Sequence, residues 1–328
     1  MTRFSVLDLV PVVEGGNLGE ALASTALLAQ AAERLGYTRF WVAEHHGMAG
    51  IASAATAVTL AHIGHATTTI RIGSGGIMLP NHSPFVIAEQ FGTLDALFPG
   101  RIDLGLGRAP GADGRIAQML RKDLMRAAEA FPSDVVELQA LFAGDPRLPL
   151  QATPGQGARV DLWILGSSLF GAQLAAMLGL PYAFASHFAP AALDQALAMY
   201  RREFRPSATL AQPYVVAAIN VIAAASDAEA VLLGSSMDQA FVALRTGTPG
   251  KLKPPVAGYR QTLPPQALAM LERFREASAV GSTETVRSRV SAFIERTGAD
   301  ELIFAGSTYD PTARIRSLEL AMTAVAGL

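Results

Sequence analysis

Polar side chains stand where apolar, strand-like runs end, which is where parallel α/β proteins carry their chemistry. Glu44, His45 and His46 follow the apolar run of residues 39–43. Successive strand side chains point to opposite faces, so we expect at most one of the two histidines to face the interior. A histidine there can transfer a proton near neutral pH. We take His45 and Glu44 as candidate catalytic residues; the alternative for the histidine is a hydrogen bond to a backbone carbonyl.

A second group of residues is suited to bind an anion. The segment Gly100–Gly111, GRIDLGLGRAPG, starts as a buried strand and then presents Arg108 between small residues. The guanidinium offers a planar fork that matches phosphate oxygens. In WILGSSLFGA, Ser167 and Ser168 precede a helix, whose free N–H groups and dipole attract the same kind of ligand. These two strand ends predict a two-sided phosphate clamp that is made of Arg108, Gly166, Ser167, Ser168 and Gly171.

The third expected strand ends in residues with small or no side chains. Ser74, Gly75 and Gly76 leave room for a flat group to lie against the backbone. The same residues can hold an unusual peptide geometry or a β-bulge. His82 lies just before a helix start and is a further candidate to face this site. We expect no metal site, because adjacent strand histidines do not converge as histidines four apart on a helix do.

Short apolar runs alternate with helical patterns along most of the chain, which predicts parallel strands joined by right-handed crossovers. Eight such runs favour a closed (β/α)8 TIM barrel, and a doubly wound open sheet is the alternative. The expected strands are Phe4–Leu9, Arg39–Ala43, Ile70–Ser74, Ile102–Leu106, Leu162–Leu165, Tyr182–Ala185, Tyr214–Ala223 and Glu301–Ala305. An excursion near residues 245–280 interrupts the alternation of strands and helices. It consists of the Pro- and Gly-rich stretch Arg245–Pro265 and an expected helix over Gln266–Ser278. That stretch is a lid, a dimer contact or a plain surface loop.

Composition limits the classes of function. The chain has 328 residues, of which 50% are hydrophobic, and its formal net charge is −2. One barrel domain over residues 1–328 accommodates this length, and the charge gives no reason to expect binding to nucleic acid or to a membrane. The absence of cysteine excludes disulfides and thiolate chemistry. The N-terminus lacks the apolar core of a signal peptide, so we expect a cytoplasmic protein.

Several familiar motifs are missing. No GxGxxG follows the first strand, no GxxxxGK[ST] occurs, and GSSLFG is not a GxSxG nucleophile elbow. A sugar-phosphate barrel enzyme would also suit Arg108 and the serines. Such an enzyme normally needs a lysine or a carboxylate pair in the mouth, and Asp8 with Glu44 is the candidate pair.

Five segments, in this order, give the chain a family resemblance. They are WVAEHHG, GSGGIMLPNHSP, FPGRIDLGLGRAPG, WILGSSLFGAQLAAMLGLP and VGSTETVRSRVSAFIERTGADELIFAG. Together they span nearly the whole chain and resemble the bacterial luciferase-like flavin monooxygenases. The GRIDLGLGRAPG form is most similar to a subgroup of single-chain oxidoreductases, some of which act in bacterial natural-product pathways.

The resemblance implies a (β/α)8 barrel with reduced FMN (FMNH2) as cosubstrate and a flavin C4a-(hydro)peroxide formed with O2. It implies a flavin reductase as partner, a homodimer and a small hydrophobic organic substrate. His45 matches the family's active-site histidine, which is thought to act as a general base. Arg108, Ser167 and Ser168 match its phosphate-binding positions.

Two further positions matter in this resemblance. Gly75 and Gly76 match the non-proline cis peptide that backs the flavin ring in the family. Gly107 stands where true luciferases carry a reactive cysteine, so light emission is not implied. Two other functions remain open: a deazaflavin (F420)-dependent hydride-transfer enzyme on the same barrel, and a flavin-binding protein without turnover.

Overall fold

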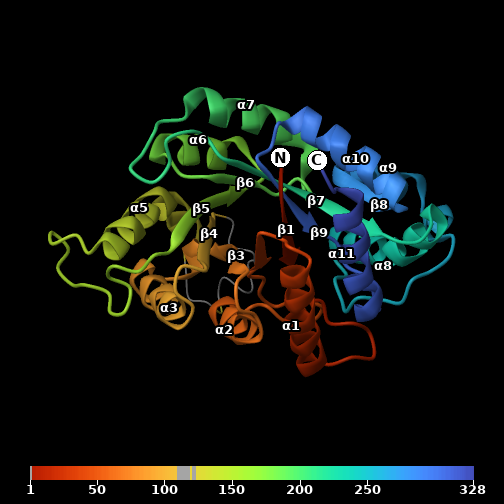
Figure 1. Ribbon diagram of the computed structural model, residues 1–328, viewed down its shortest axis with the longest axis horizontal. Helices are drawn as coiled ribbons and strands as arrows, with labels where there is room; N and C mark the ends of the chain where they lie inside the picture. Colours follow the sequence, from red (N-terminus) through yellow and green to blue (C-terminus); the bar gives the residue numbers. More distant parts are fainter. Residues whose placement is uncertain (1, 109–118, 120–122) are drawn as a thin grey trace.

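The computed structural model describes residues 2–108, 119 and 123–328, and it shows a closed parallel barrel surrounded by helices (Figure 1). The barrel strands are β1 (Arg3–Asp8), β2 (Arg39–Val42), β3 (Arg71–Met78), β4 (Ile102–Gly107), β5 (Asp161–Gly166), β6 (Tyr182–Phe184), β7 (Val215–Ala223) and β9 (Glu301–Ala305). Each strand pairs in parallel with its neighbour, and β9 pairs with both β7 and β1. Because the last strand returns to the first, the open-sheet alternative is excluded.

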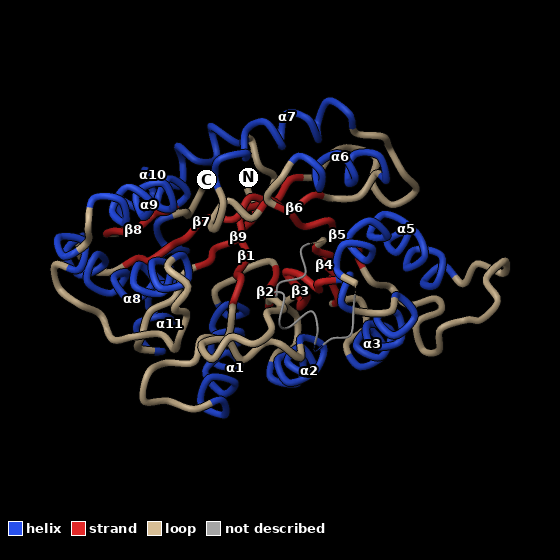
Figure 2. Tube along the Cα trace, turned by 180° about the vertical axis from the view of Figure 1, so that it is seen from behind, coloured by secondary structure: helices blue, strands red, loops and turns tan. Residues whose placement is uncertain are grey.

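Helices cover the outside of the barrel, and in both views the strands occupy the centre (Figures 1 and 2). They are α1 (Leu18–Arg34), α2 (Thr56–Ala66), α3 (Pro84–Leu97), α5 (Leu124–Ala143), α6 (Leu169–Leu178), α7 (Leu193–Glu203), α8 (Asp227–Arg245), α9 (Pro265–Phe274), α10 (Thr283–Thr297) and α11 (Pro311–Ala324). Short 3-10 turns η1 (Leu79–Asn81), η2 (Pro190–Ala192), η3 (Tyr259–Thr262) and η4 (Arg275–Ala277) join some of them. The two chain ends meet, since the Thr2 N–H donates to the Leu328 carbonyl at 3.3 Å.

All eight expected strands are present, with ends that shift by a few residues. The Ser83–Pro84 pattern marks the start of α3 as expected, although the Ser83 side chain makes no capping hydrogen bond. Asp310 caps α11 by accepting the N–H of Thr312. The turn that the sequence predicts after Arg108, at Pro110 and Gly111, lies outside the described residues.

Two apolar layers follow from the alternation of strand side chains. One large cluster lies between the strands and the helices and includes Phe40 and Val42 of β2. A separate cluster fills the barrel interior and includes Leu7, Trp41 and Trp163, whose two indoles meet edge to face at 5.3 Å. Odd-numbered residues of β2 therefore face inward, which sets the direction of the residues that follow.

A buried ion network closes the end of the barrel where the strands begin. Arg39 donates to Asp103 and to Glu301, both at 2.8 Å, and its guanidinium stacks over the Trp163 ring at 4.5 Å. Both carboxylates are fully buried. Arg71 donates to Asp103 as well, at 2.6 Å, so two guanidinium groups balance the two buried carboxylates.

The insertion near residues 245–280 is present, but its second half differs from the expected helix over Gln266–Ser278. Helix α9 ends at Phe274, and residues Ser278–Gly281 form a ninth strand, β8, on the part of β7 that extends beyond the barrel. The first half packs against the loop after β1, where the Leu252 N–H donates to the Val12 carbonyl at 2.9 Å. It therefore lies at the rim where the strands end.

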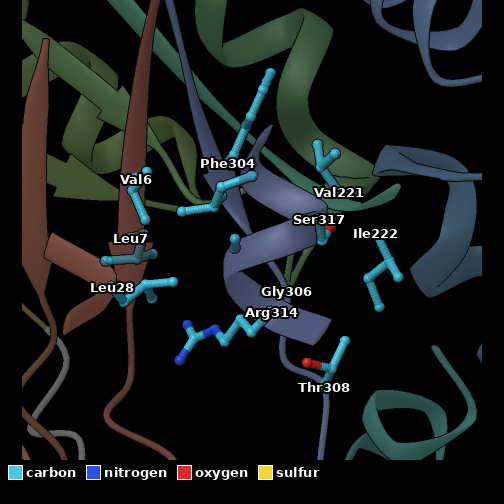
Figure 3. Close-up of a pocket in the computed structure, with 12 residues that line it drawn as sticks. Val6, Leu7, Leu28, Val221, Ile222, Phe304, Gly306, Thr308, Arg314 and Ser317 are labelled. Atoms are coloured by element: carbon cyan, nitrogen blue, oxygen red, sulfur yellow. The ribbon is translucent and has the colours of Figure 1, made fainter. Parts of the chain in front are cut away.

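A small cavity lies outside the barrel wall, between β1, β7, β9, α1 and α11 (Figure 3). Its volume of about 10 Å³ holds a single water at most. Beside it, Arg314 donates to Asp8 at 2.7 Å, and Asp8 also accepts the Thr25 hydroxyl. Asp8 is thus engaged on the outer side, and the carboxylate pair of Asp8 and Glu44 that a sugar-phosphate enzyme would need is not formed. No helix among the described residues is long and apolar enough to cross a membrane.

Candidate active site

The strand ends opposite the ion network present small residues to the barrel interior. Ala43, Ala183, Ala218 and Ala305 belong to the interior cluster, and they follow or lie within β2, β6, β7 and β9. Small side chains at this edge leave room for a ligand, and in parallel barrels the chemistry is found at this edge. We call this edge the barrel mouth.

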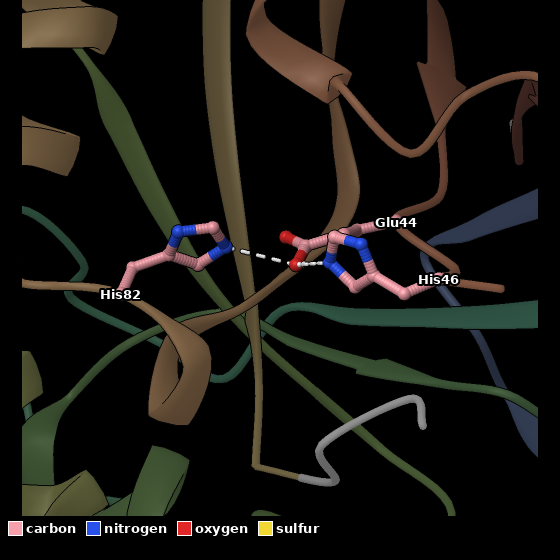
Figure 4. Close-up of side chains that lie close together, drawn as sticks. All are labelled: Glu44, His46 and His82. Atoms are coloured by element: carbon pink, nitrogen blue, oxygen red, sulfur yellow. Dashed lines mark hydrogen bonds and ion pairs between the residues drawn. The ribbon is translucent and has the colours of Figure 1, made fainter. Parts of the chain in front are cut away.

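Glu44 binds two histidines at once (Figure 4). Its side chain is buried, and the same oxygen, Oε1, accepts Nε2–H of His46 at 2.6 Å and of His82 at 2.8 Å. The other oxygen accepts the N–H of Met78 at 3.0 Å. Glu44 therefore ties the end of β2 to the end of β3 and to the start of α3.

These contacts determine the charge of Glu44. Burial alone would raise its pKa, but the hydrogen bonds from His82, His46 and Met78 outweigh burial and hold the pKa below its ordinary value. The ligand atoms of Glu44, His46 and His82 lie within 4.8 Å of one another, which is close enough for a metal ion. Both imidazole nitrogens contact the carboxylate oxygen itself, however, so an ion would have to displace both hydrogen bonds.

His45 is the histidine left for the mouth. It continues the inward positions of Trp41 and Ala43, and its ring makes no hydrogen bond with any described residue. Burial lowers the pKa of His45, the Glu44 carboxylate opposes that shift and His46 adds to it. The imidazole is thus neutral at pH 7 and able to accept a proton. The alternative of a carbonyl-bonded histidine does not hold for His45 within the described part of the chain.

The end of β3 forms a flat backbone surface. The Gly75–Gly76 peptide bond is cis, as the resemblance implies, and the pairing with β4 shifts register between Gly75 and Ile77. A Cβ at Gly75 would lie 2.8 Å from Leu7 Cδ1, and one at Gly76 would lie 2.7 Å from the Gly105 carbonyl oxygen. A side chain at Gly76 would collide with the backbone of β4, and one at Gly75 would press on the Leu7 and Trp41 side chains. Ser74 is fully buried and donates its hydroxyl to the Gly105 carbonyl at 2.9 Å, so its side chain is not free to bind a ligand.

Arg108 meets the start of α6. Its guanidinium lies 4.0 Å from the centre of the Phe170 ring, in the first turn of that helix. Ser168 is the N-cap of α6, yet its side chain makes no capping hydrogen bond, and Ser167 and Ser168 are both exposed. The first-turn N–H groups, two free hydroxyls and a guanidinium therefore converge on one exposed spot.

Gly166 and Gly171 lie where the end of β5 meets the start of α6. A Cβ at Gly171 would lie 3.3 Å from the Tyr182 ring, a tight contact, whereas one at Gly166 would lie 3.7 Å from the Cα of Gly171, an ordinary contact. The close packing therefore favours glycine at position 171.

Sequence reasoning missed His187, in the loop after β6. Its ring is half-buried, and its Nδ1 atom is buried with no hydrogen-bond partner among the described residues. Burial lowers the pKa of His187 to about 4, with a further contribution from His45. The available signal was the one that identified His45, a histidine just after an apolar strand.

A parallel barrel whose mouth combines a neutral histidine, a side-chain-free platform and an anion-binding helix start is suited to an enzyme with a phosphorylated ring cofactor. The sequence profile of the luciferase-like monooxygenases matches residues 2–301. The chain belongs to this family of monooxygenases.

The comparisons include close relatives over the full length. A luciferase-like monooxygenase of Escherichia coli (strain K12) is 51% identical over 320 residues, which are 97% of this chain and 96% of the relative. The crystal structure of apo-MsnO8 has a TM-score of 0.88 and 33% identity, and the match covers 99% of this chain and 98% of that one. An N-acetyl-S-alkylcysteine monooxygenase of Bacillus subtilis (strain 168) is 38% identical over 190 residues, 56% of this chain and 57% of the relative.

More distant structures share the barrel with two kinds of cofactor. The oxygenating component of 3,6-diketocamphane monooxygenase from Pseudomonas putida, in complex with FMN, has a TM-score of 0.72 at 17% identity and covers 99% of this chain and 98% of that one. An F420-dependent secondary alcohol dehydrogenase has a TM-score of 0.73 at 16% identity and covers 99% of both chains. At these identities the likeness concerns the fold alone.

Proposed function

We propose that this protein uses reduced FMN and O2 to insert one oxygen atom into a small hydrophobic organic substrate. The observation that carries the proposal is the anion site of Arg108 and α6 beside the flat backbone of Gly75 and Gly76. When bound, reduced FMN would supply the activation of O2. The chain's own residues would bind the flavin, exclude water and handle the proton.

The phosphate of FMN fits the start of α6. An exposed N-cap with free hydroxyls has unmet hydrogen-bonding capacity, and a dianion would satisfy it. Stacking on Phe170 holds the Arg108 guanidinium beside that helix start. Arg108, Ser167 and Ser168 would bind the phosphate, while Gly166 and Gly171 let the helix start approach.

The flavin ring fits the platform on β3. A planar ring needs a stretch of backbone that carries no side chains, and neither Gly75 nor Gly76 carries one. Ser74 would hold this part of β3 in place, because its buried hydroxyl is bonded to the Gly105 carbonyl of the neighbouring strand β4.

His45 would carry the proton of the reaction. Its imidazole is neutral at pH 7 and has no partner among the described residues, so a ring nitrogen is free to accept a proton from the bound reactants. For Glu44 we propose a positioning role, because its carboxylate is fully engaged with His46, His82 and Met78. It would fix the backbone that aims His45 into the mouth.

Three finer points belong to the same proposal. A separate flavin reductase would supply reduced FMN, since no dinucleotide fingerprint is present in the sequence. The chain would form a homodimer through α2 and α3, which lie side by side and expose Val58, Val86 and Leu97 (Figures 1 and 2). We place the protein in the cytoplasm.

A single-turnover experiment tests this function. Protein loaded anaerobically with FMNH2 is mixed with ¹⁸O2-saturated buffer that contains an uncharged thioether, the methyl ester of N-acetyl-S-butylcysteine, a first substrate suggested by the name of the Bacillus relative. We expect slower flavin reoxidation than in free solution and one ¹⁸O atom in the sulfoxide. Reoxidation at the rate of free FMNH2, with no labelled product, contradicts the proposal.

A further inference from the structure

His187 lies across the barrel from His45. The strand order around the barrel is β1, β2, β3, β4, β5, β6, β7 and β9, so β2 and β6 are four strands apart in either direction. His45 follows β2 and His187 follows β6. The two imidazoles thus approach the mouth from opposite walls, and a charge on His45 would lower the pKa of His187.

The loop that carries His187 is firmly held. Asn220 of β7 donates its side-chain N–H to the His187 carbonyl at 2.8 Å, and the Ser186 hydroxyl donates to the Ala218 carbonyl. On the other side, the Arg245 guanidinium stacks over the Phe188 ring at 4.7 Å. Backbone and neighbours fix this loop, whereas no hydrogen bond from the described residues holds the imidazole.

A buried imidazole nitrogen without a hydrogen bond costs free energy, unless a ligand supplies the missing partner. Buried polar atoms are normally hydrogen-bonded, and Nδ1 of His187 is buried without a partner among the described residues. The adjacent polar side chains do not supply one, because Ser186 is bonded to Ala218 and Asn220 to the His187 backbone. A turn of the half-buried ring would bring Nδ1 to a water or to a molecule bound in the mouth.

The position of His187 favours the substrate over the flavin. A ring that lies on Gly75 and Gly76 has one face covered by β3, and its free face looks across the barrel toward β7, which is four strands from β3. The co-reactant must approach that free face. His187 lies beside β7, on the same wall, whereas the anion site for the phosphate lies at β4 and β5.

We propose that His187 is a specificity-determining residue whose Nδ1 makes a hydrogen bond to an uncharged polar group of the organic substrate. This inference rests on the proposed function. A neutral imidazole suits a carbonyl, an amide or a hydroxyl group, and it does not compensate a carboxylate. The substrate is therefore an apolar molecule with an uncharged hydrogen-bonding group, and plain hydrocarbons bind less well.

A matched pair of ligands tests this in the FMN-loaded protein. Acetophenone and ethylbenzene have similar shape and differ by a carbonyl oxygen. Calorimetric titration measures both dissociation constants for the wild type, for His187→Leu and for His187→Asn, whose amide lies near the position of Nδ1. Gln195→Leu serves as the control, because Gln195 is exposed on α7, away from the mouth.

We expect His187→Leu to weaken acetophenone binding by about 3- to 10-fold and to leave ethylbenzene unchanged or tighter, as a net hydrogen bond predicts. His187→Asn restores most of the loss, and Gln195→Leu matches the wild type. Equal effects on both ligands, or no binding of acetophenone to the wild type, overturn the inference. A loss of FMN affinity in His187→Leu overturns it too, since His187 would then contact the flavin. Failure of the wild type to bind FMN or FMNH2 refutes the proposed function instead.

Discussion

Arg108 offers the sharpest test of the phosphate site. The Arg108→Ala variant removes the guanidinium that stacks on Phe170 at the start of α6, and it leaves the helix itself intact. A charge-assisted hydrogen bond contributes about 1.5–3 kcal/mol, which corresponds to roughly 10- to 150-fold in affinity. Arg108 is exposed, so solvent and salt screen it and the lower half of that range applies. Arg108→Lys keeps the charge but loses the planar fork, and we expect an intermediate loss.

Comparing FMN with riboflavin isolates the phosphate. The two ligands share the ring and differ in the phosphate, so Arg108→Ala should weaken FMN binding and leave riboflavin binding unchanged. Fluorescence titration at two salt concentrations measures both, and the FMN deficit should shrink at high salt. Arg202→Ala, an exposed arginine on α7, is the matched control. An equal loss for FMN and riboflavin, or none for FMN, would refute the assignment of Arg108 to the phosphate.

Four further predictions follow from the same geometry. His45→Ala should bind FMNH2 normally but oxidise substrate at least 10-fold more slowly, as expected for loss of a general base; a wild-type rate in single-turnover assays removes His45 from the chemistry. Gly76→Ala should lower the free energy of unfolding by about 1–3 kcal/mol, because its Cβ would lie 2.7 Å from the Gly105 carbonyl oxygen; an unchanged urea midpoint argues against that close approach. Val58→Glu should convert a dimer into a monomer in sedimentation experiments, since Val58 is 72% exposed on α2, and a wild-type mass of one chain would dismiss the dimer. The unfolded chain protonates His187 below about pH 6.5, whereas burial lowers the pKa of His187 in the folded chain to about 4. The free energy of unfolding should therefore decrease more steeply in the wild type than in His187→Leu as the pH is lowered from about 6.5 to about 4, and parallel curves of this free energy against pH would exclude the contribution.

Local sequence patterns were sufficient to predict the barrel. Each of the eight strands has its own apolar run, and their order along the chain leaves a parallel barrel as the closed solution. The short strand β8 was not predicted, because its four residues, SAVG, continue a helical pattern. Its partner is the part of β7 that extends beyond the barrel, with Asn220 opposite Ser278, and that pairing is not visible locally.

The site was predictable where backbone chemistry fixes it. Gly75 and Gly76 form the cis peptide that the family resemblance implied, and Arg108 reaches the α6 start because their strands are neighbours. The remaining site residues depend on contacts between segments that are distant in the sequence. His82 turns to Glu44 across 38 residues, and the environment of His187 depends on Asn220 in another strand.

Anaerobic titration with FMNH2, oxidised FMN and the deazaflavin F420 tests the central claim most directly. The account predicts saturable binding of FMNH2, weaker binding of F420, which lacks the FMN-like terminal phosphate, and a long-lived absorbance change when air is admitted. Binding of F420 in preference to either flavin state would point to hydride transfer. Binding of oxidised FMN alone, with no reaction in air, would leave a flavin-binding protein without turnover, and either result would contradict the account.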